Sequence, residues 1–318
     1  MFNSAACISF YSKILIACFC ISIFGCASPP TPTERLKCAD SLASAHSWYP
    51  LDIQTDSFKL HAYLPVFHKD SNTLTIYIEG DGFAWYSINL PSDDPTPINP
   101  IGLKLALAQP NGVAVYLARP CQYLEKKDAS YCSAAVWTNE RYSEKVIYST
   151  NQAIDILKEH FHAKKLTLVG YSGGAAVAAL VAVRRDDIDK IITVAGNMDH
   201  RAWSAYERIS PLDGSLDPVD FIGSLENIKQ WYLVGGKDTV VPSSLTQQFV
   251  NQFSIKHRPK ILLQADFDHH CCWVEHWPSL WRNIEQGQKE INEGTKIMDE
   301  SERTFEEKYP NQKLYLVK

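Results

Sequence analysis

The sequence lacks the excess of basic residues that a nucleic-acid-binding protein needs. Lys and Arg number 31 against 36 Asp and Glu, which leaves a formal net charge of -5 at pH 7. There is also no stripe of Lys and Arg interleaved with aromatic residues that would follow a phosphate backbone. Charged residues make up 21% of the chain and hydrophobic residues 45%, a balance that excludes intrinsic disorder and allows a large core. Nucleic acid is therefore not an expected partner.

The chain also lacks an internal repeat and an apolar run long enough to cross a bilayer. The run from Ile14 to Gly25 has about a dozen residues and follows a single positive charge, Lys13. This pattern is typical of a secretory signal peptide. It predicts that the protein is exported.

The signal ends in Ile23-Phe24-Gly25-Cys26, which resembles the lipobox of bacterial lipoproteins, although Phe24 replaces the usual small residue. The resemblance implies cleavage after residue 25 and lipidation of Cys26. A plain cleaved signal, or a short N-terminal anchor helix, is the alternative.

The residues after Cys26 are expected to form a tether. Residues 27–33 are rich in Pro and predict an extended segment that holds a domain off a membrane surface. Ala27 resembles the outer-membrane sorting pattern, so we expect the protein at the periplasmic face of that membrane. The expected units are a signal peptide (1–25), a tether and N-terminal segment (26–50), one main domain (51–286) and a polar C-terminal helix or tail (287–318).

Cysteine is moderately abundant, and export permits disulfides. Three of the nine cysteines lie in the signal and Cys26 would carry lipid, so five remain in the exported domain. Cys121 and Cys132 enclose a short polar loop and are the first expected pair. The other three, Cys38, Cys271 and Cys272, leave their pairing open, and an odd number leaves at least one thiol unpaired or unusually paired.

Short β-rich runs alternate with segments compatible with helices, which predicts a mostly parallel sheet with helices on both faces. Several of the runs are almost continuously apolar, as strands buried on both sides should be. The expected strands are 60–66, 74–78, 113–117, 166–169, 191–194, 231–234 and 261–263, and the expected helices are 143–161, 173–184, 243–253 and 280–292.

A G-x-S-x-G pattern, Gly170-Tyr-Ser172-Gly-Gly174, follows the expected strand 166–169 and precedes an alanine-rich helix. Its glycines allow a strand and a helix to meet at a tight turn that exposes the serine. A serine hydroxyl needs a base and a group that orients the base. Asp238 follows the next-to-last expected strand, and His269 and His270 follow the last one, so candidates for both partners lie at strand ends.

The order Ser, Asp, His along the chain, with each residue after a strand, resembles the α/β-hydrolase superfamily, and the resemblance covers roughly residues 60–281. It implies an α/β-hydrolase fold with a small cap after the sixth strand, and a triad of Ser172, Asp238 and His269. His270 is the alternative base. Four further stretches, 119–122, 195–199, 211–215 and 269–273, look like those of poorly characterised bacterial lipoprotein hydrolases.

The resemblance also implies an oxyanion hole of two backbone N–H groups, one of which belongs to Gly173. The second is expected at Asp81, with Gly82 as the next candidate, in the stretch that follows strand 74–78. Glu79 and Asp81 would oppose a developing negative charge. We therefore expect both side chains to point outward into hydrogen bonds.

Three competing interpretations concern neighbouring residues. The cluster of His and Cys around residues 269–276 could hold zinc, but adjacent Cys271 and Cys272 do not have the spacing of a tetrahedral site. A disulfide is more expected there, and no metal or cofactor is predicted.

Asp199 could replace Asp238 as the acid, or cap the next segment. Residues 198–228, rich in aromatics and Pro, are expected to form a lid or pocket wall, or else a packed connector.

Together these patterns predict a serine hydrolase that cleaves an ester or thioester of a small molecule or lipid through an acyl-enzyme. Peptidase or amidase activity is less expected. The contrasting hypothesis is a noncatalytic binding lipoprotein of the cell envelope with the same fold. Only a hydrolase would have a serine that a fluorophosphonate traps.

Overall fold

A computed structural model describes residues 28–68, 71–125, 131–287 and 295–296. The expected signal peptide and Cys26 lie outside the described residues, as does nearly all of the expected C-terminal tail. Within the described part of the chain, no helix has both the length and the apolar character needed to cross a bilayer.

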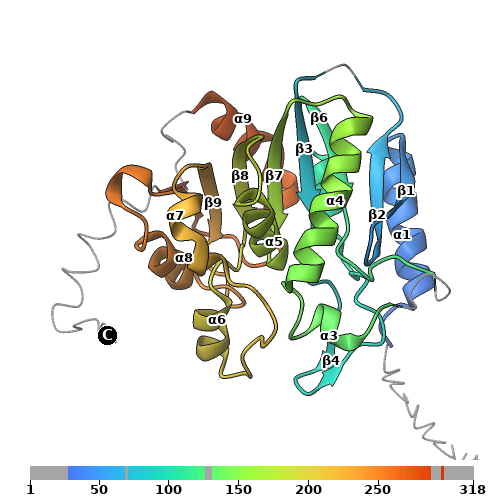
Figure 1. The fold of residues 1–318 in the computed structure, drawn as a ribbon, viewed down its shortest axis with the longest axis horizontal. Helices are drawn as coiled ribbons and strands as arrows, with labels where there is room; N and C mark the ends of the chain where they lie inside the picture. Colours follow the sequence, from blue (N-terminus) through green and yellow to red (C-terminus); the bar gives the residue numbers. More distant parts are fainter. Residues whose placement is uncertain (1–27, 69–70, 126–130, 288–294, 297–318) are drawn as a thin grey trace, which may run out of the picture.

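The centre of the molecule is one twisted sheet (Figure 1) in the order β1-β2-β6-β3-β7-β8-β9-β10-β11. The strands from β6 to β10 in this order are parallel, and β1, β2 and β11 pair with their neighbours in antiparallel fashion. The mostly parallel sheet is therefore confirmed. The strands are β1 Trp48–Gln54, β2 Lys59–Pro65, β3 Thr73–Ile78, β6 Val113–Leu117, β7 Lys165–Tyr171, β8 Ile188–Val194, β9 Lys229–Gly235, β10 Lys260–Gln264 and β11 Thr295–Lys296.

Helices cover both faces of the sheet because its parallel strands are apolar on both sides. Every residue of β6 is buried, for example. The helices α4 (Glu144–His160), α5 (Gly173–Ala182) and α8 (Ser243–Val250) contribute to the core on one face. On the other face, α1 (Pro32–Ala45), α2 (Ile101–Leu107) and α9 (Trp273–Gln286) contribute to a second core.

The N-terminal part of the fold begins earlier than the sequence indicated. Thr31 caps α1 through a reciprocal arrangement with Glu34, so Pro32 and Thr33 of the expected tether are helical. The strand β1 starts at Trp48 and pairs with β2 along its whole length. The sheet thus takes in residues that precede position 51.

The last helix was placed wrongly by the sequence analysis, which expected it at 280–292. It runs from Trp273 to Gln286 and contains Pro278 in its second turn. Trp273, Trp277 and Trp281 recur every four residues and are buried, which places them on one face against the sheet. Gly287 ends the helix with a left-handed φ of 61°.

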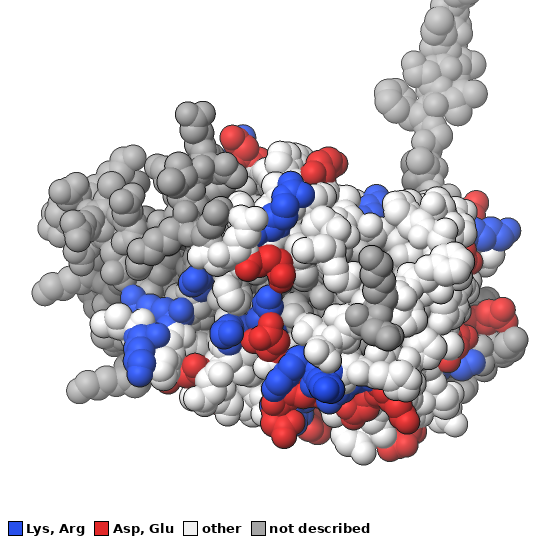
Figure 2. Space-filling model, turned by 90° about the horizontal axis from the view of Figure 1, so that it is seen from above, with Lys and Arg blue, Asp and Glu red and all other residues white. Residues whose placement is uncertain are grey.

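The two ends of the sheet differ in their side chains. Figure 2 shows the end that faces up in Figure 1, where the parallel strands begin and where basic and acidic groups lie against one another. Asp187, next to β8, accepts from Lys158 at 2.6 Å and from Arg185 at 2.8 Å. Arg185 also pairs with Asp155 at 2.7 Å. The opposite end, where the parallel strands finish, holds the candidate site.

Candidate active site

Ser172 lies at the turn between β7 and α5, with φ 51° and ψ -121°. A left-handed φ is strained for a serine, and such strain is typical of an exposed nucleophile turn. A Cβ on Gly170 would overlap the backbone of Ala175, and one on Gly174 would overlap the carbonyl oxygen of Ile78. Both glycines of the motif are therefore required for the close approach of strand and helix.

His269 and Asp238 are brought to this serine from the ends of β10 and β9. His269 Nε2 lies 3.0 Å from Ser172 Oγ, and His269 Nδ1 lies 2.8 Å from Asp238 Oδ2. With the proton on Nδ1, the ring donates to Asp238 and leaves Nε2 to accept from the serine hydroxyl. Asp238 is held in turn, because its Oδ1 accepts from the N–H groups of Val240 and Val241 at 2.8 Å each.

His270, the alternative base, does not face the serine. Its Nδ1 lies 2.9 Å from the hydroxyl of Tyr171, which also donates to the carbonyl oxygen of His269 at 3.0 Å. The turn that separates the two histidine rings is held by Asp268, whose carboxylate accepts from the N–H groups of His270 and Cys271 at 2.7 Å each. The geometry therefore favours His269.

The structure also places Asp199 and the cysteines, which were named from the sequence. Asp199 caps α6 (His200–Glu207) by accepting from the N–H of Ala202 at 2.8 Å. Cys121 and Cys132 form a disulfide, as do the adjacent Cys271 and Cys272, and Cys38 is free and exposed. Among the residues that the structure describes, no group of His, Cys, Asp and Glu is arranged to hold a metal ion.

Glu79 corrects one expectation, because its side chain points inward. It is 1% exposed, and its Oε1 accepts from the N–H groups of Gly80 and Gly102 at 3.0 Å each. Burial raises the pKa of Glu79, and the N–H groups that face the carboxylate oppose this rise. Glu79 thus joins the end of β3 to the N-terminus of α2, where unpaired N–H groups favour a carboxylate.

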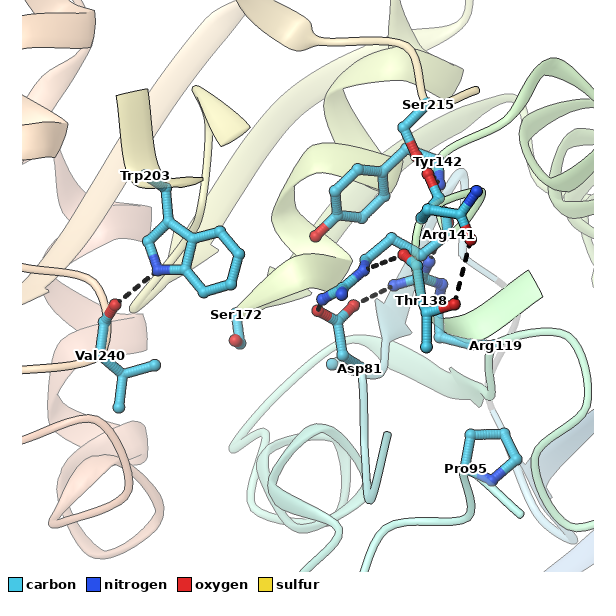
Figure 3. A network of polar contacts seen from close by, with 12 residues as sticks. Asp81, Pro95, Arg119, Thr138, Arg141, Tyr142, Ser172, Trp203, Ser215 and Val240 are labelled. Carbon is cyan, nitrogen blue, oxygen red and sulfur yellow. Dashed lines mark hydrogen bonds and ion pairs between the residues drawn. The ribbon is translucent and has the colours of Figure 1, made fainter. Parts of the chain in front are cut away.

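Asp81 is half-buried, in a cluster with Arg119 and Arg141 that we call the Asp81 cluster (Figure 3). Arg119 Nη1 donates to Asp81 Oδ1 at 3.2 Å, and Arg141 Nη1 donates to Asp81 Oδ2 at 2.5 Å. Burial alone would raise the pKa of Asp81, but the two guanidinium groups outweigh it and hold that pKa below its usual range. Both arginine side chains are buried, and two cations around one carboxylate leave an excess of one positive charge.

The Asp81 cluster lies directly against Gly173, in the turn that carries Ser172. A Cβ on Gly173 would overlap Asp81 Oδ1 and would lie 2.7 Å from the hydroxyl of Tyr142. Residue 173 therefore has no room for a side chain. In the sequence, Arg119 stands out only within a stretch that resembles other hydrolases, and Arg141 follows no recognisable motif and was not predicted.

A cleft of about 1240 Å³ opens above Ser172. One wall contains residues 81–85, 87–89 and 97–99, and the other contains Trp203, residues 209–212 and Val240. Trp203 Nε1 donates to the carbonyl oxygen of Val240 at 2.8 Å, which joins the cap to the loop that carries Asp238. Residues 198–228 follow β8, the sixth strand of the central sheet in chain order, and their first half supplies the pocket wall expected from the sequence.

Comparison with known proteins agrees with this geometry. Residues 106–271, slightly more than half of the chain, match the sequence model of a family described as serine hydrolase (FSH1). The matched segment contains Ser172, Asp238 and His269 and ends before Cys272; Asp81 lies outside it. No curated protein matches the sequence.

Solved structures share the fold at low sequence identity. Est1E from Butyrivibrio proteoclasticus has a TM-score of 0.52 at 15% identity, covering 75% of this chain and 98% of its own. The esterase Pf2001 from Pyrococcus furiosus has a TM-score of 0.53 at 13% identity, with coverages of 82% and 92%. The acylaminoacyl peptidase from Pyrococcus horikoshii has a TM-score of 0.53 at 11% identity, with coverages of 78% and 43%.

Proposed function

The chain belongs to the FSH1 serine hydrolase family and has the α/β-hydrolase fold, and from this premise we propose that it cleaves an ester or thioester through an acyl-enzyme on Ser172. The observation that carries the proposal is the continuous chain of hydrogen bonds from Ser172 Oγ through His269 to Asp238. Asp238 and His269 are buried at the floor of an open cleft, so the substrate meets the serine while water has little access to the relay behind it.

In the proposed reaction, His269 Nε2 takes the proton of Ser172 as Oγ attacks the substrate carbonyl carbon. Asp238 stabilises the imidazolium that forms and keeps the ring in the tautomer that can accept at Nε2. The imidazolium then gives its proton to the departing alcohol or thiol. Water, deprotonated by the same nitrogen, attacks the acyl-enzyme and releases the acid.

The oxyanion of this reaction is proposed to bind the backbone N–H groups of Gly173 and Asp81. The Asp81 carboxylate would oppose the developing charge if it stood alone. Because the Asp81 cluster carries one excess positive charge, its net effect is to favour the oxyanion. Arg119 and Arg141 therefore act as positioning residues, which hold the loop of Asp81 against Gly173 and favour negative charge beside Ser172.

We further propose that the protein is exported and lipid-anchored at Cys26, at the periplasmic face of the outer membrane. The support is the sequence Ile23-Phe24-Gly25-Cys26 and the run of apolar residues before it. The test is the intact mass of the membrane-extracted protein, which should equal the chain from residue 26 plus a diacylglyceryl group. A Cys26→Ser protein should lack that added mass. A mature chain without added lipid mass would contradict the anchor.

The nucleophile is tested by fluorophosphonate labelling of the full-length protein, read by intact mass together with turnover of p-nitrophenyl butyrate. Wild type should gain one adduct, and Ser172→Ala should gain none and lose its turnover, because no other group could replace the alkoxide. Tyr171→Phe, a neighbour on the same turn, serves as a control that should still be labelled. A folded wild type that takes no label would contradict the proposal and favour a noncatalytic binding lipoprotein.

A further inference from the structure

One wall of the cleft is an exposed hairpin without charge. It consists of β4 (Trp85–Ser87) and β5 (Leu90–Pro91), and no charged residue occurs from Phe83 to Ser92. Its large apolar side chains face solvent: Trp85 is 39% exposed, Tyr86 46%, Ile88 79% and Leu90 57%. We call residues 83–92 the apolar hairpin. So many exposed apolar side chains in one short segment mark a contact surface.

Apolar side chains also occur beyond the hairpin at the mouth of the cleft, although the opposite wall carries the exposed charged residues Glu207 and Arg208 as well. Ile98, which lies beyond the hairpin and lines the same wall, is 43% exposed. On the opposite wall, Val240 is 40% exposed and lies beside Trp203. A bilayer surface that meets this rim would therefore contact apolar side chains on both walls of the cleft, and the cleft would open toward that surface.

The N-terminal end of the described chain is attached beside the apolar hairpin. Arg35, in the first turn of α1, donates to the carbonyl oxygens of Asp94 and Thr96. Its guanidinium also lies 5.3 Å from the ring centroid of Phe83, at the base of the hairpin. Figure 1 shows β4 at the lower end of the molecule, the end at which the parallel strands finish.

This attachment limits the distance between the hairpin and any lipid on Cys26. Helix α1 starts at Pro32 behind a formed cap, so it begins six residues after Cys26. Six residues span at most about 20 Å when fully extended. A lipid-anchored chain therefore holds this end of the molecule close to the bilayer, and the charged end shown in Figure 2 points away from it.

We propose that the apolar hairpin inserts into the surface of the anchoring bilayer, and that esters dissolved in that bilayer enter the cleft from it. The inference rests on the lipid anchor and hydrolase activity proposed above, and it names the substrate class as membrane-resident lipid esters. Trp and Tyr are suited to the interface because their rings are apolar and their N–H or O–H remains in the headgroup layer. Ile88 and Leu90 gain by leaving water. Ser172 then acquires the lipid's acyl group, the alcohol leaves with the proton from His269, and water completes hydrolysis.

Insertion itself is tested by fluorescence of the full-length lipidated protein in vesicles of phosphatidylethanolamine and phosphatidylglycerol with brominated acyl chains. The chain has eight Trp residues, so the signal of Trp85 is the difference between wild type and Trp85→Phe. Bromine quenches by contact, and wild type should lose more fluorescence than Trp85→Phe does. Equal fractional quenching of the two proteins would overturn the proposal.

Entry from the bilayer is tested by comparing p-nitrophenyl palmitate held in vesicles with p-nitrophenyl butyrate in solution. The double variant Tyr86→Ser, Leu90→Ser changes two exposed hairpin residues that do not line the cleft. Its turnover of the vesicle ester should fall about tenfold, with turnover of the soluble ester unchanged. The matched control is Phe67→Ser, Ile255→Ser, which removes two side chains, each 85% exposed, far from the cleft, and should affect neither substrate.

The outcomes separate this inference from the proposed function. Equal losses on both esters would mean that the hairpin acts inside the cleft as a lid, and no loss on the vesicle ester would mean that it is not a docking surface; both overturn the inference. A wild type that cleaves butyrate but not the vesicle ester overturns it as well. Absence of all turnover and of labelling at Ser172 would instead contradict the hydrolase proposal, while the quenching experiment would still decide insertion.

Discussion

The two ends of the sheet pair their charged side chains differently. Where the parallel strands begin, Lys158 and Arg185 face Asp187 and Asp155, so two cations meet two carboxylates. Where these strands finish, Arg119 and Arg141 face Asp81 alone. Balanced pairs contribute to stability, whereas an unbalanced cluster beside a nucleophile costs stability and favours an anion there. The comparison leads us to expect that the balanced pairs serve the stability of the fold and that the unbalanced cluster serves the proposed reaction.

The largest expected effect separates the two adjacent histidines at the cleft end. His269→Ala should lower kcat/KM for p-nitrophenyl butyrate by about 10³-fold to 10⁴-fold, because Ser172 loses its base. His270→Ala should lower it by less than about tenfold, since His270 contacts Tyr171 and not the serine. Steady-state kinetics with both variants measures this, and thermal unfolding checks that both are folded. Equal losses would contradict the assignment of the base.

The unbalanced cluster is tested by Asp81→Asn. The amide leaves two guanidinium groups without their shared anion, so the loop that carries the proposed oxyanion donor should shift. We expect kcat to fall about 10-fold to 100-fold with a smaller change in KM. Labelling of Ser172 by fluorophosphonate should slow in parallel. A loss of stability without any loss of kcat would show that the cluster serves the fold alone.

The same kind of change at the end with balanced charges, Asp187→Asn, should have the opposite outcome, a loss of stability without a loss of kcat. Burial would raise the pKa of Asp187, but its hydrogen bonds from Arg185 and Lys158 outweigh this and lower the pKa to about 2. A lowered pKa stabilises the folded state above the unfolded value of about 4, and this stabilisation disappears as the pH falls from 4 to 2. The variant should therefore lose about 1–2 kcal/mol of unfolding free energy at pH 7 and keep its kcat.

Denaturant unfolding at a series of pH values checks the sign of this effect. The difference between wild type and Asp187→Asn should shrink as the pH approaches 3. A difference that persists unchanged in acid would show that packing, and not ionisation, accounts for the loss.

The smallest effect is expected for Lys190, on the rim of the charged end. Its ammonium lies 2.9 Å from Glu285 and 3.5 Å from Asp189, but both carboxylates are more than one third exposed. Water screens such pairs, so Lys190→Ala should cost less than about 1 kcal/mol and leave kcat unchanged. Raising the salt concentration should reduce the difference further. A larger cost would show that the charged end acts as one network.

Much of the site could be predicted because its residues occupy strand ends. In a parallel sheet the carboxyl ends of β7, β9 and β10 meet at one edge, so Ser172, Asp238 and His269 had to lie near one another once the strands were recognised. Their hydrogen bonds match that expectation, and their catalytic roles stay predictions. Arg141 could not be predicted in the same way, since it follows the short helix α3 (Ala134–Trp137) and no pattern links it to Asp81.

Two predictions, the orientation of Glu79 and the start of the last helix, were wrong because tertiary packing outweighed the local sequence signals. Glu79 was expected to point outward because a carboxylate in the oxyanion hole would oppose the developing negative charge, but the N-terminus of α2 supplies N–H groups that bind it inside. The last helix was expected to begin after Pro278, but the buried face formed by Trp273, Trp277 and Trp281 sustains it from residue 273. In both cases the deciding partner is distant in sequence.

By itself the sequence determined the class of fold, the order of its parallel strands along the chain, and the strand ends that carry Ser172, Asp238 and the two candidate histidines. These follow from local periodicity and from motifs whose spacing is read along the chain. Only the tertiary structure decided which histidine faces Ser172, that two arginines surround Asp81, and that the apolar hairpin lies beside the start of α1. Each of these depends on contacts between segments far apart in sequence, and it is packing of the sheet and its helices that brings them together.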